Sequence, residues 1–481
     1  MSISNPAART YMYYVILLIM FAGGIWFILA RGSMLSSGRL PANATTEALA
    51  APTPGAAVSS PIVPSTYLGR LLQNSHRSPL SILLLQIIVI IIAARLMAGV
   101  FLKIGQPPVM GEMVAGIVLG PSVLGLIAPS AMAFLFPPSS MGTLGALSQI
   151  GVVLFMFIVG MELDIQHLRE KAAAAIMISH ASIIVPFLLG TSLALLLYLP
   201  LAPANTSFAA FALFMGIAMS ITAFPVLARI LEDRGLSETR LGSTAIACAA
   251  IDDVTAWCIL AFVIAIVKST GVTGSILTIA LVLLFVIVML LLVKPRIASP
   301  ITQRVAQQTQ VRGLLAVILA FVLACAWFTE SVGIHALFGA FLAGVTMPAN
   351  AGVRRFLRER LEAFVSAALL PLFFVFTGLR TEIRLLNDWS SWSICGAIIV
   401  VAVAGKLGGS MLMARWTRMS WRDSYAIGVL MNTRGLIELV VLNIGYDLGI
   451  LSARIFVMMV IMALVTTFMT APLLSFIELR K

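Results

Sequence analysis

The chain has 481 residues, of which 60% are hydrophobic and only 10% are charged, and its mean hydropathy is +1.06. Such a chain has too little polar surface to cover a particle exposed to water, so we exclude a soluble globular protein and expect a polytopic membrane protein. The formal net charge is +12, but most basic residues lie in short connections between apolar segments. Basic residues there orient membrane helices, so nucleic-acid binding is also excluded.

Fourteen apolar segments approach the length of about 20 residues that a helix needs to cross the hydrocarbon core. They are residues 12–30, 79–102, 108–127, 140–161, 172–198, 206–231, 239–267, 273–293, 312–330, 333–349, 361–379, 391–414, 424–447 and 453–477. The connections after alternate segments are basic, whereas those between them are nearly uncharged. By the positive-inside rule the basic connections face the cytoplasm, which predicts a plasma-membrane protein with both termini inside.

The first segment is long and follows a single basic residue, Arg9, which favours an uncleaved signal-anchor helix in residues 1–30 over a cleaved signal peptide. Residues 31–78 are rich in Ala, Pro, Ser and Thr and have no hydrophobic period, so we predict a flexible linker on the outer side. A body of thirteen helices should follow, with no soluble domain after it.

Two segments of this body, 206–231 and 424–447, contain residues that ordinary lipid-facing helices avoid. A proline in mid-helix removes a backbone donor, and polar side chains can replace interrupted backbone hydrogen bonds. The segments are the fifth and the twelfth of the body and therefore run in opposite directions, which predicts an inverted-repeat transporter whose two broken helices cross near an ion site. The residues that mark the breaks are Thr222 and Pro225 in the first segment and Asn432 and Thr433 in the second.

Two adjacent aspartates, Asp252 and Asp253, lie in the middle of the apolar segment 239–267. A carboxylate at this depth costs roughly 2.5–3.5 kcal/mol even on lenient insertion scales, so the pair predicts a functional site. Neighbouring helical residues project about 100° apart, so the two carboxylates cannot bind one small ion in the same way. Lys406 is equally deep in its segment, and we expect it to pair with one aspartate, with the surrounding glycines packed against the aspartate helix.

A buried pair of this kind predicts a proton switch, because a bound cation favours the ionised carboxylate and so competes with protons for it. The alternative interpretation is a static buried salt bridge. Arg434 and Glu438 are four residues apart on one helix, and we expect them to brace the break by pairing with each other rather than to handle the ion.

Five motifs occur in order along the chain: SITAFPVLARIL, AAIDDVTAW, VGIHALFGAFLAGVTMP, LPLFFVFTGLRT and MNTRGLIELVVLNIG. With them, residues 79–476 resemble the second family of monovalent cation:proton antiporters, which holds Kef-type potassium systems, bacterial sodium/proton exchangers and plant cation/H+ exchangers. The resemblance implies an all-α, inverted-repeat Na+/H+ antiporter-like fold that exchanges Na+ or K+ for H+. It also implies a homodimer, no cofactor and no enzymatic activity. The extra first helix and the absence of a soluble tail depart from the Kef and plant pattern.

The resemblance further implies that one domain moves against the other like an elevator. The core ion-transport domain would be residues 172–267 and 391–477, the dimerisation panel residues 79–161 and 312–380, and the linking helix residues 273–293.

Family members of this kind bind the transported ion at the second acid of the pair. That acid is Asp253 here, with Thr222 as a further cation ligand at the crossing, where Asn432 also falls. The first acid, Asp252, would pair with Lys406. Two acids combined with this lysine imply electrogenic exchange.

Two other functional classes compete with this interpretation. A passive, gated cation channel would tend to show a filter loop or rings of charge, and the sequence shows neither. An intramembrane enzyme that uses paired aspartates with Mg2+ would need a second acidic motif, which is also missing. The choice between Na+ and K+, the stoichiometry and the direction of transport stay open.

Overall fold

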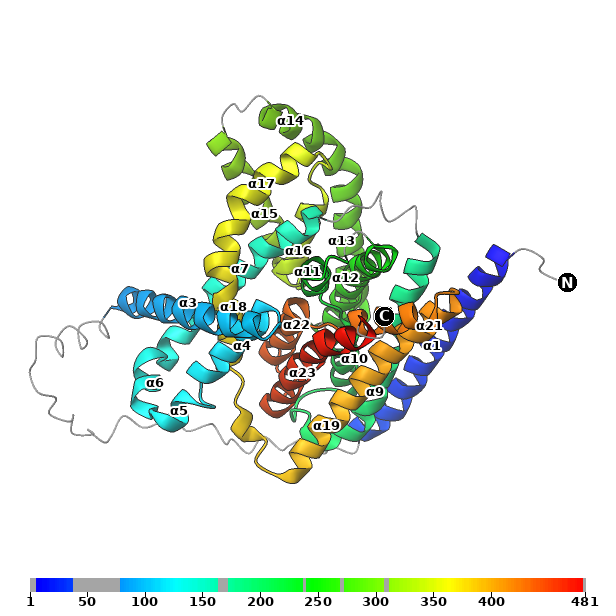
Figure 1. The fold of residues 1–481 in the computed structure, drawn as a ribbon, viewed down its shortest axis with the longest axis horizontal. Helices are drawn as coiled ribbons and strands as arrows, with labels where there is room; N and C mark the ends of the chain where they lie inside the picture. Colours follow the sequence, from blue (N-terminus) through cyan, green and yellow to red (C-terminus); the bar gives the residue numbers. More distant parts are fainter. Residues whose placement is uncertain are drawn as a thin grey trace, which may run out of the picture.

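The computed structural model describes residues 6–37, 78–162, 172–236, 239–268, 272–306 and 311–478. Within these ranges every regular element is helical, and the predicted all-α fold is confirmed (Figure 1). The first helix, α1 (Pro6–Ser37), continues past the expected end at residue 30. The prediction of a flexible linker over residues 31–78 is therefore wrong for residues 31–37, which are helical. Residues 38–77 lie outside the described residues.

Eleven helical segments in the described part of the chain are long and apolar enough to cross a membrane, or twelve with one bent pair of helices. The sequence predicted fourteen. The difference lies in residues 206–231 and 333–349, whose apolar helices α10 (Phe208–Ser220) and α16 (Ala336–Val345) have 13 and 10 residues. Both are shorter than the roughly 20 residues of a full crossing, because a break or a turn interrupts each apolar segment.

One set of helices, which we call the first group, packs around α4, α7 and α18. Proline begins several of its helices, where the missing backbone donor would have no partner in any case. The members of the group are α3 (Pro79–Lys103), α4 (Pro108–Leu119), α5 (Leu124–Ile127), α6 (Pro129–Leu135), α7 (Pro138–Glu162), α15 (Val311–Ser331), α16, α17 (Ala351–Phe364), the π-helix η2 (Val365–Leu369) and α18 (Leu370–Leu379).

One very close contact in the first group is the crossing of α7 and α16. A Cβ atom on Gly160 would lie 2.1 Å from the carbonyl oxygen of Phe341, and one on Gly344 would lie 2.2 Å from that of Phe157. Glycine at both positions therefore lets the two backbones touch, as small residues do in membrane helix pairs.

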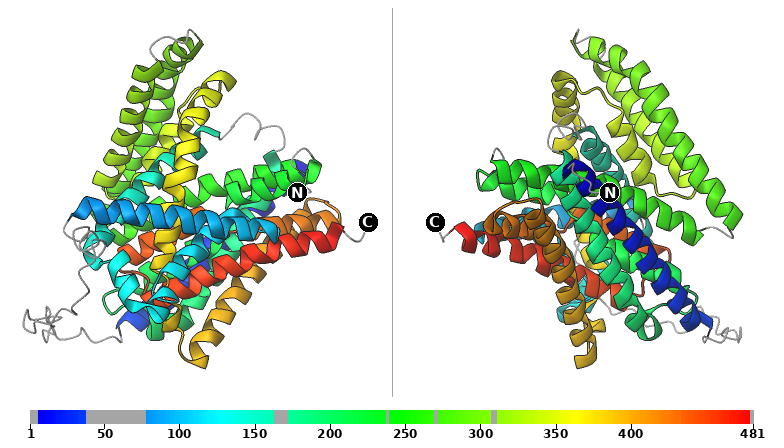
Figure 2. Two further views of the ribbon diagram at one scale, coloured as in Figure 1. Left: turned by 60° about the vertical axis from the view of Figure 1, so that its left-hand side comes forward. Right: turned by 90° about the vertical axis from the view of Figure 1, so that its right-hand side faces the viewer.

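The second group surrounds α9 and α12. It consists of α9 (Ala172–Leu201), α10, α11 (Phe224–Asp233), α12 (Arg240–Lys268), α19 (Trp389–Val403), the π-helix η4 (Ala404–Gly408), α20 (Gly409–Trp416), α21 (Trp421–Met431), α22 (Leu436–Asp447) and α23 (Ala453–Glu478). Helix α1 packs against α9 and α10 along the edge of this group (Figure 2). The side chains of Ser207, Asp388 and Ser420 cap the backbone amides that begin α10, α19 and α21.

Three consecutive helices connect the groups in sequence: α13 (Val272–Ile287), the π-helix η1 (Val288–Val293) and α14 (Lys294–Ala306). Helix α13 packs on α12 of the second group, and α14 packs on α15 and α17 of the first. The short 3-10 helix η3 (Ile383–Leu385) lies in the connection from α18 to α19 and contacts α23.

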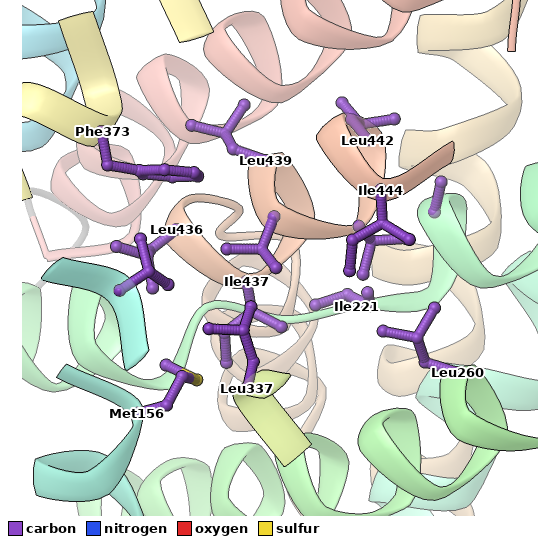
Figure 3. Packing of buried hydrophobic residues seen from close by; sticks show 14 of the residues in the cluster. Met156, Ile221, Leu260, Leu337, Phe373, Leu436, Ile437, Leu439, Leu442 and Ile444 are labelled. Carbon is purple, nitrogen blue, oxygen red and sulfur yellow. The ribbon is translucent and has the colours of Figure 1, made fainter. Parts of the chain in front are cut away.

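The surface between the two groups is lined by apolar side chains (Figure 3). Met156 and Phe373 from the first group face Ile221, Leu260 and Ile437 from the second, and all five are buried. Side chains of this kind make no directional hydrogen bonds, so dispersion and buried apolar area hold this part of the junction together.

Candidate functional site

The first break lies between α10 and α11. Helix α10 ends at Ser220, residues 221–223 are extended, and α11 begins at Phe224. Pro225 is thus the second residue of a new helix, and the expectation that it interrupts a continuous helix is wrong. In the first turn a proline removes no hydrogen bond, because that backbone amide has no acceptor inside the helix.

The second break lies between α21 and α22, which are bent by 42°. Helix α21 ends at Met431 and α22 begins at Leu436. The hydroxyl of Thr467 on α23 accepts a hydrogen bond from the backbone amide of Arg434 at 3.0 Å and donates one to its carbonyl at 2.9 Å. One side chain therefore replaces both backbone partners that Arg434 lacks outside a helix.

The two breaks touch each other directly. The backbone amide of Ala223 donates to the carbonyl of Thr433 at 3.0 Å, and the hydroxyl oxygen of Thr222 lies 3.2 Å from the carbonyl oxygen of Met431. All four residues are buried. Segments that are 210 residues apart in sequence thus satisfy each other's backbone groups at one point inside the protein (Ala223 to Thr433).

Asp252 is fully buried and has a complete set of donors. Its carboxylate lies 3.0 Å from Nζ of Lys406, and it accepts hydrogen bonds from the hydroxyls of Thr222 at 2.7 Å and Ser182 at 2.6 Å. A further hydrogen bond comes from Ser179. One ammonium and three hydroxyls therefore stabilise this charge.

Asp253, the next residue of α12, is also buried, but neither of its carboxylate oxygens has a hydrogen-bond partner among the described residues. The side-chain oxygen of Asn432 is likewise buried and unpartnered at the end of α21, and α12 packs against both α11 and α21. Thr222, which we expected beside Asp253, donates its hydroxyl to Asp252 instead. Unpartnered carboxylate and amide oxygens in a dry interior are costly unless a proton or a cation satisfies them.

Lys406 and Arg434 both hold the carbonyl end of α10. Nζ of Lys406 donates to the carbonyl of Ser220, the last residue of that helix, and the guanidinium of Arg434 donates to the carbonyls of Ala218 and Met219 at 3.0 and 2.7 Å. The last carbonyls of a helix lack backbone donors and carry the negative end of its dipole. Two buried cations therefore stabilise the open end of α10 at the break.

Arg434 also forms an ion pair with Glu438, at 3.3 Å between Nη1 and Oε1, and both side chains are fully buried. We expected the pair to brace the break within its own segment. The structure adds a contact to the other broken segment, because the same guanidinium binds α10.

The glycines around Lys406 do not pack against the aspartate helix as expected. A Cβ on Gly405 would lie 2.9 Å from Cα of Pro186, and one on Gly409 would lie 3.0 Å from Cβ of Val185, so both face α9. Lys406 itself lies in the π-helix η4, and π-helical turns often occur at functional sites.

The sequence analysis did not identify three residues of this arrangement: Ser179, Ser182 and Thr467. Ser179 and Ser182 are three residues apart and therefore lie on one face of α9, in an otherwise apolar segment. That spacing was a usable signal for a polar face at depth. Thr467 has no such signal, because it stands in a run of threonines on α23.

Two broken helices in contact beside a buried aspartate pair, in a chain with eleven or twelve apolar spans among its described residues, are typical of an inverted-repeat secondary transporter. Residues 71–477 match the family described as "Sodium/hydrogen exchanger, transmembrane", and the chain belongs to that family.

Among its curated relatives, the chain is 43% identical over 396 residues to the Na(+)/H(+) antiporter NhaS4 of Synechocystis sp., covering 82% of this chain and 96% of that protein. It is 39% identical over 406 residues to the Cation/H(+) antiporter 17 of Arabidopsis thaliana, covering 83% and 49%. It is 33% identical over 406 residues to the K(+)/H(+) antiporter 1 of Saccharomyces cerevisiae, covering 82% and 46%. The chain thus spans nearly all of the cyanobacterial relative and about half of the plant and yeast ones.

Among solved structures, the sodium proton antiporter MjNhaP1 from Methanocaldococcus jannaschii at pH 8 has a TM-score of 0.56 and 14% sequence identity, over 84% of this chain and 99% of that chain. A second structure of MjNhaP1 gives a TM-score of 0.60 at 13% identity. At this identity the likeness shows a shared fold, and it supports the predicted antiporter-like architecture.

Proposed function

We propose that the protein is a secondary antiporter that exchanges a monovalent cation, Na+ or K+, for H+. The observation that carries the proposal is the asymmetry of the aspartate pair: Asp252 has a full set of donors, whereas both oxygens of Asp253 are buried with no hydrogen-bond partner in the described ranges. A proton or a small cation satisfies such a carboxylate equally well, and the two compete for it.

The proposed cation site combines Asp253 with the side-chain oxygen of Asn432 and with backbone carbonyls at the breaks. Thr222 contributes its lone pairs from the first break. Oxygen ligands of this kind suit Na+ and K+ alike, so the set does not choose between the two ions. In the proposed cycle, protonation of Asp253 releases the cation on one side of the membrane, and deprotonation admits it on the other.

Lys406 is the proposed second proton carrier. One carboxylate alone gives an exchange of one proton for one cation, which moves no net charge. If Lys406 also gives up its proton when the cation binds, two protons move against one cation and each cycle transfers one positive charge. The buried position of this ammonium, with Asp252 as its counter-charge, supports the electrogenic form of the proposal.

The two helix groups would supply the elevator-like movement. We assign the second group, residues 172–267 and 391–477, as the moving core and the first group, residues 79–161 and 312–380, as the dimerisation panel of a homodimer, joined by residues 273–293. The apolar surface between them supports this assignment, because sliding along it breaks few directional contacts (Figure 3). The protein would act in the plasma membrane with both termini in the cytoplasm.

The test is cation-dependent dissipation of a pH gradient in proteoliposomes, with Na+, K+, Li+ and Rb+ compared, with and without a clamped membrane potential. The parent protein should dissipate the gradient with Na+ or K+, and Asp253→Asn should abolish it. Asp388→Asn is a matched control, because this exposed aspartate caps α19 and asparagine caps a helix equally well. Full proton flux in Asp253→Asn would show that the ion site lies elsewhere.

The same experiment separates antiport from a passive channel. A channel would pass cations with no counter-moving proton, so cation flux would continue when the pH on the two sides is equal and would follow the membrane potential alone. Antiport predicts that cation flux and proton flux stop together.

A further inference from the structure

Two cavities lie between the two helix groups at one end of the molecule. The larger, of about 500 Å3, lies between the connection of α3 to α4 and the helices α11 and α23, and its lining includes Gln106, Pro107, Arg234 and Ser475. The smaller, of about 20 Å3, shares Pro107 with it and lies against the second break, at Arg434. A volume of roughly 10–15 Å3 is enough for one water, so the smaller cavity has room for one, although most of its lining is apolar.

The opposite end of the same junction is closed by polar contacts between α18 and α22. Arg380, which follows α18, forms an ion pair with Asp447 at 2.8 Å and donates to the side-chain oxygen of Asn443 at 3.0 Å. The amide of Asn443 donates in turn to the hydroxyl of Thr377 at 2.9 Å. We call these four residues the latch. The three latch contacts just named all run from the first group to the second.

Aromatic rings hold the guanidinium of Arg380 in place. It lies 4.6 Å from the ring centroid of Phe376 in the first group and 5.5 Å from that of Tyr446 in the second. Such contacts favour a fixed, planar orientation of the arginine. The latch is therefore a formed structure rather than a chance surface pair.

The latch and the larger cavity lie at opposite ends of the second group. The cavity is lined by Ala471 and Ser475 near the end of α23, whereas the latch lies at the end of α22, just before α23 begins. Helix α23 has 26 residues, so its two ends are about 39 Å apart at 1.5 Å per residue. This distance is of the order of a membrane's thickness.

We propose that the latch is the gate that closes the ion pathway on the side away from the basic connections. In this structure the pathway is then open at the opposite end, where the larger cavity lies. The inference rests on the proposed antiport. Because every latch contact joins the two groups, a movement of one group against the other must break them in each cycle. The side chains of Arg380 and Asp447 are 25% and 40% exposed, so their ion pair is weak enough to open repeatedly.

The first test makes the latch unable to open. Arg380→Cys and Asp447→Cys are introduced together into a Cys258→Ser protein, since Cys258 is the exposed native cysteine, and are bridged with a short bifunctional thiol reagent. The reagent is one that forms disulfides, so exchange should stop when the bridge forms and return when it is reduced, while each single cysteine variant should exchange at the same rate with and without the reagent. A bridged protein, verified by peptide mass, that exchanges at the unbridged rate would overturn the proposal.

The second test weakens the latch without blocking it. Arg380→Gln should make the site easier to reach from the latch side, so the apparent KM for the cation on that side should fall by about two- to fivefold, the range of a partly exposed ion pair. Arg384→Gln, an exposed arginine in the same connection, is the matched control. Unchanged KM values on both sides in Arg380→Gln would refute the gate, whereas an absence of any cation-coupled exchange in the parent protein would instead refute the antiport.

Discussion

The pairing of Lys406 with Asp252 can be tested by a double-mutant cycle on stability. Lys406→Met removes the ammonium and leaves a fully buried carboxylate. Loss of one partner from a buried ion pair typically costs about 3–5 kcal/mol, because the remaining charge has no compensation. The hydroxyls of Ser182 and Thr222 still donate to this carboxylate, so we expect the free energy of unfolding to fall by about 3 kcal/mol, the lower end of that range.

Asp252→Asn removes the charge from the other side of the pair. The ammonium of Lys406 then keeps hydrogen bonds to the backbone carbonyls of Ser182 and Ser220, but it has no counter-charge within the pair. We therefore expect the free energy of unfolding of this variant to fall by a similar amount, about 3 kcal/mol. The double variant has neither charge, and buried pairs replaced by neutral groups of similar volume are often close to neutral in stability, so we expect a coupling energy of at least about 2 kcal/mol.

Thermal unfolding in detergent, followed by intrinsic fluorescence at one fixed scan rate, measures the cycle. A fixed rate is needed because unfolding of large membrane proteins is commonly irreversible and the apparent midpoint depends on the scan. Both single variants should unfold well below the parent, and the double variant should recover most of the loss. If the double variant were destabilised by the sum of the two single losses, the ion pair would contribute nothing and the site would need another explanation.

Three further predictions use stability or flux as the measurement. Asp253→Asn should abolish exchange yet raise the unfolding midpoint, because it removes a buried carboxylate whose oxygens accept no hydrogen bond within the described part of the chain; a lower midpoint would contradict this. Thr467→Val should lower the free energy of unfolding by about 1–3 kcal/mol, because the backbone amide and carbonyl of Arg434 at the second break both lose their hydrogen-bond partner. Thr466→Val should lower it much less, because that hydroxyl bonds to a carbonyl of its own helix. Gly160→Ala should destabilise the protein or prevent its expression, whereas Gly142→Ala on the same helix meets no atom within 4 Å and should be neutral; equal effects of the two would refute the close crossing of α7 and α16.

The sequence predicted the all-α membrane fold from local signals, and it predicted the antiporter-like class from the resemblance of five motifs to a known family. Apolar segments of spanning length are visible one by one, and charged residues inside them are rare enough to mark a site. Asp252, Asp253, Lys406 and Asn432 were found in this way. Helix boundaries were less well predicted, because the exact end of α10 depends on donors from distant segments rather than on Pro225.

Partners of the site residues could not be predicted, because they come from contacts between segments far apart in the chain. Thr222 was expected beside Asp253 because the family resemblance implies a cation ligand at the crossing of the broken helices, and this does not tell which side of α12 a neighbour faces. The same holds for the glycines around Lys406, which face α9. A glycine indicates that some backbone approaches closely, but its position in the sequence does not identify that backbone.

The contacts of Lys406 connect the site to the break in α10. Its ammonium binds Asp252 and the terminal carbonyl of α10 at the same time, and Arg434 binds the two preceding carbonyls. If Lys406 lost its proton, its charge would no longer offset either the carboxylate or the negative end of the α10 dipole. Protonation of Lys406 would therefore change the electrostatics at the first break and at Asp252 together, so a proton carried there would act on the helix ends that form the proposed ion site.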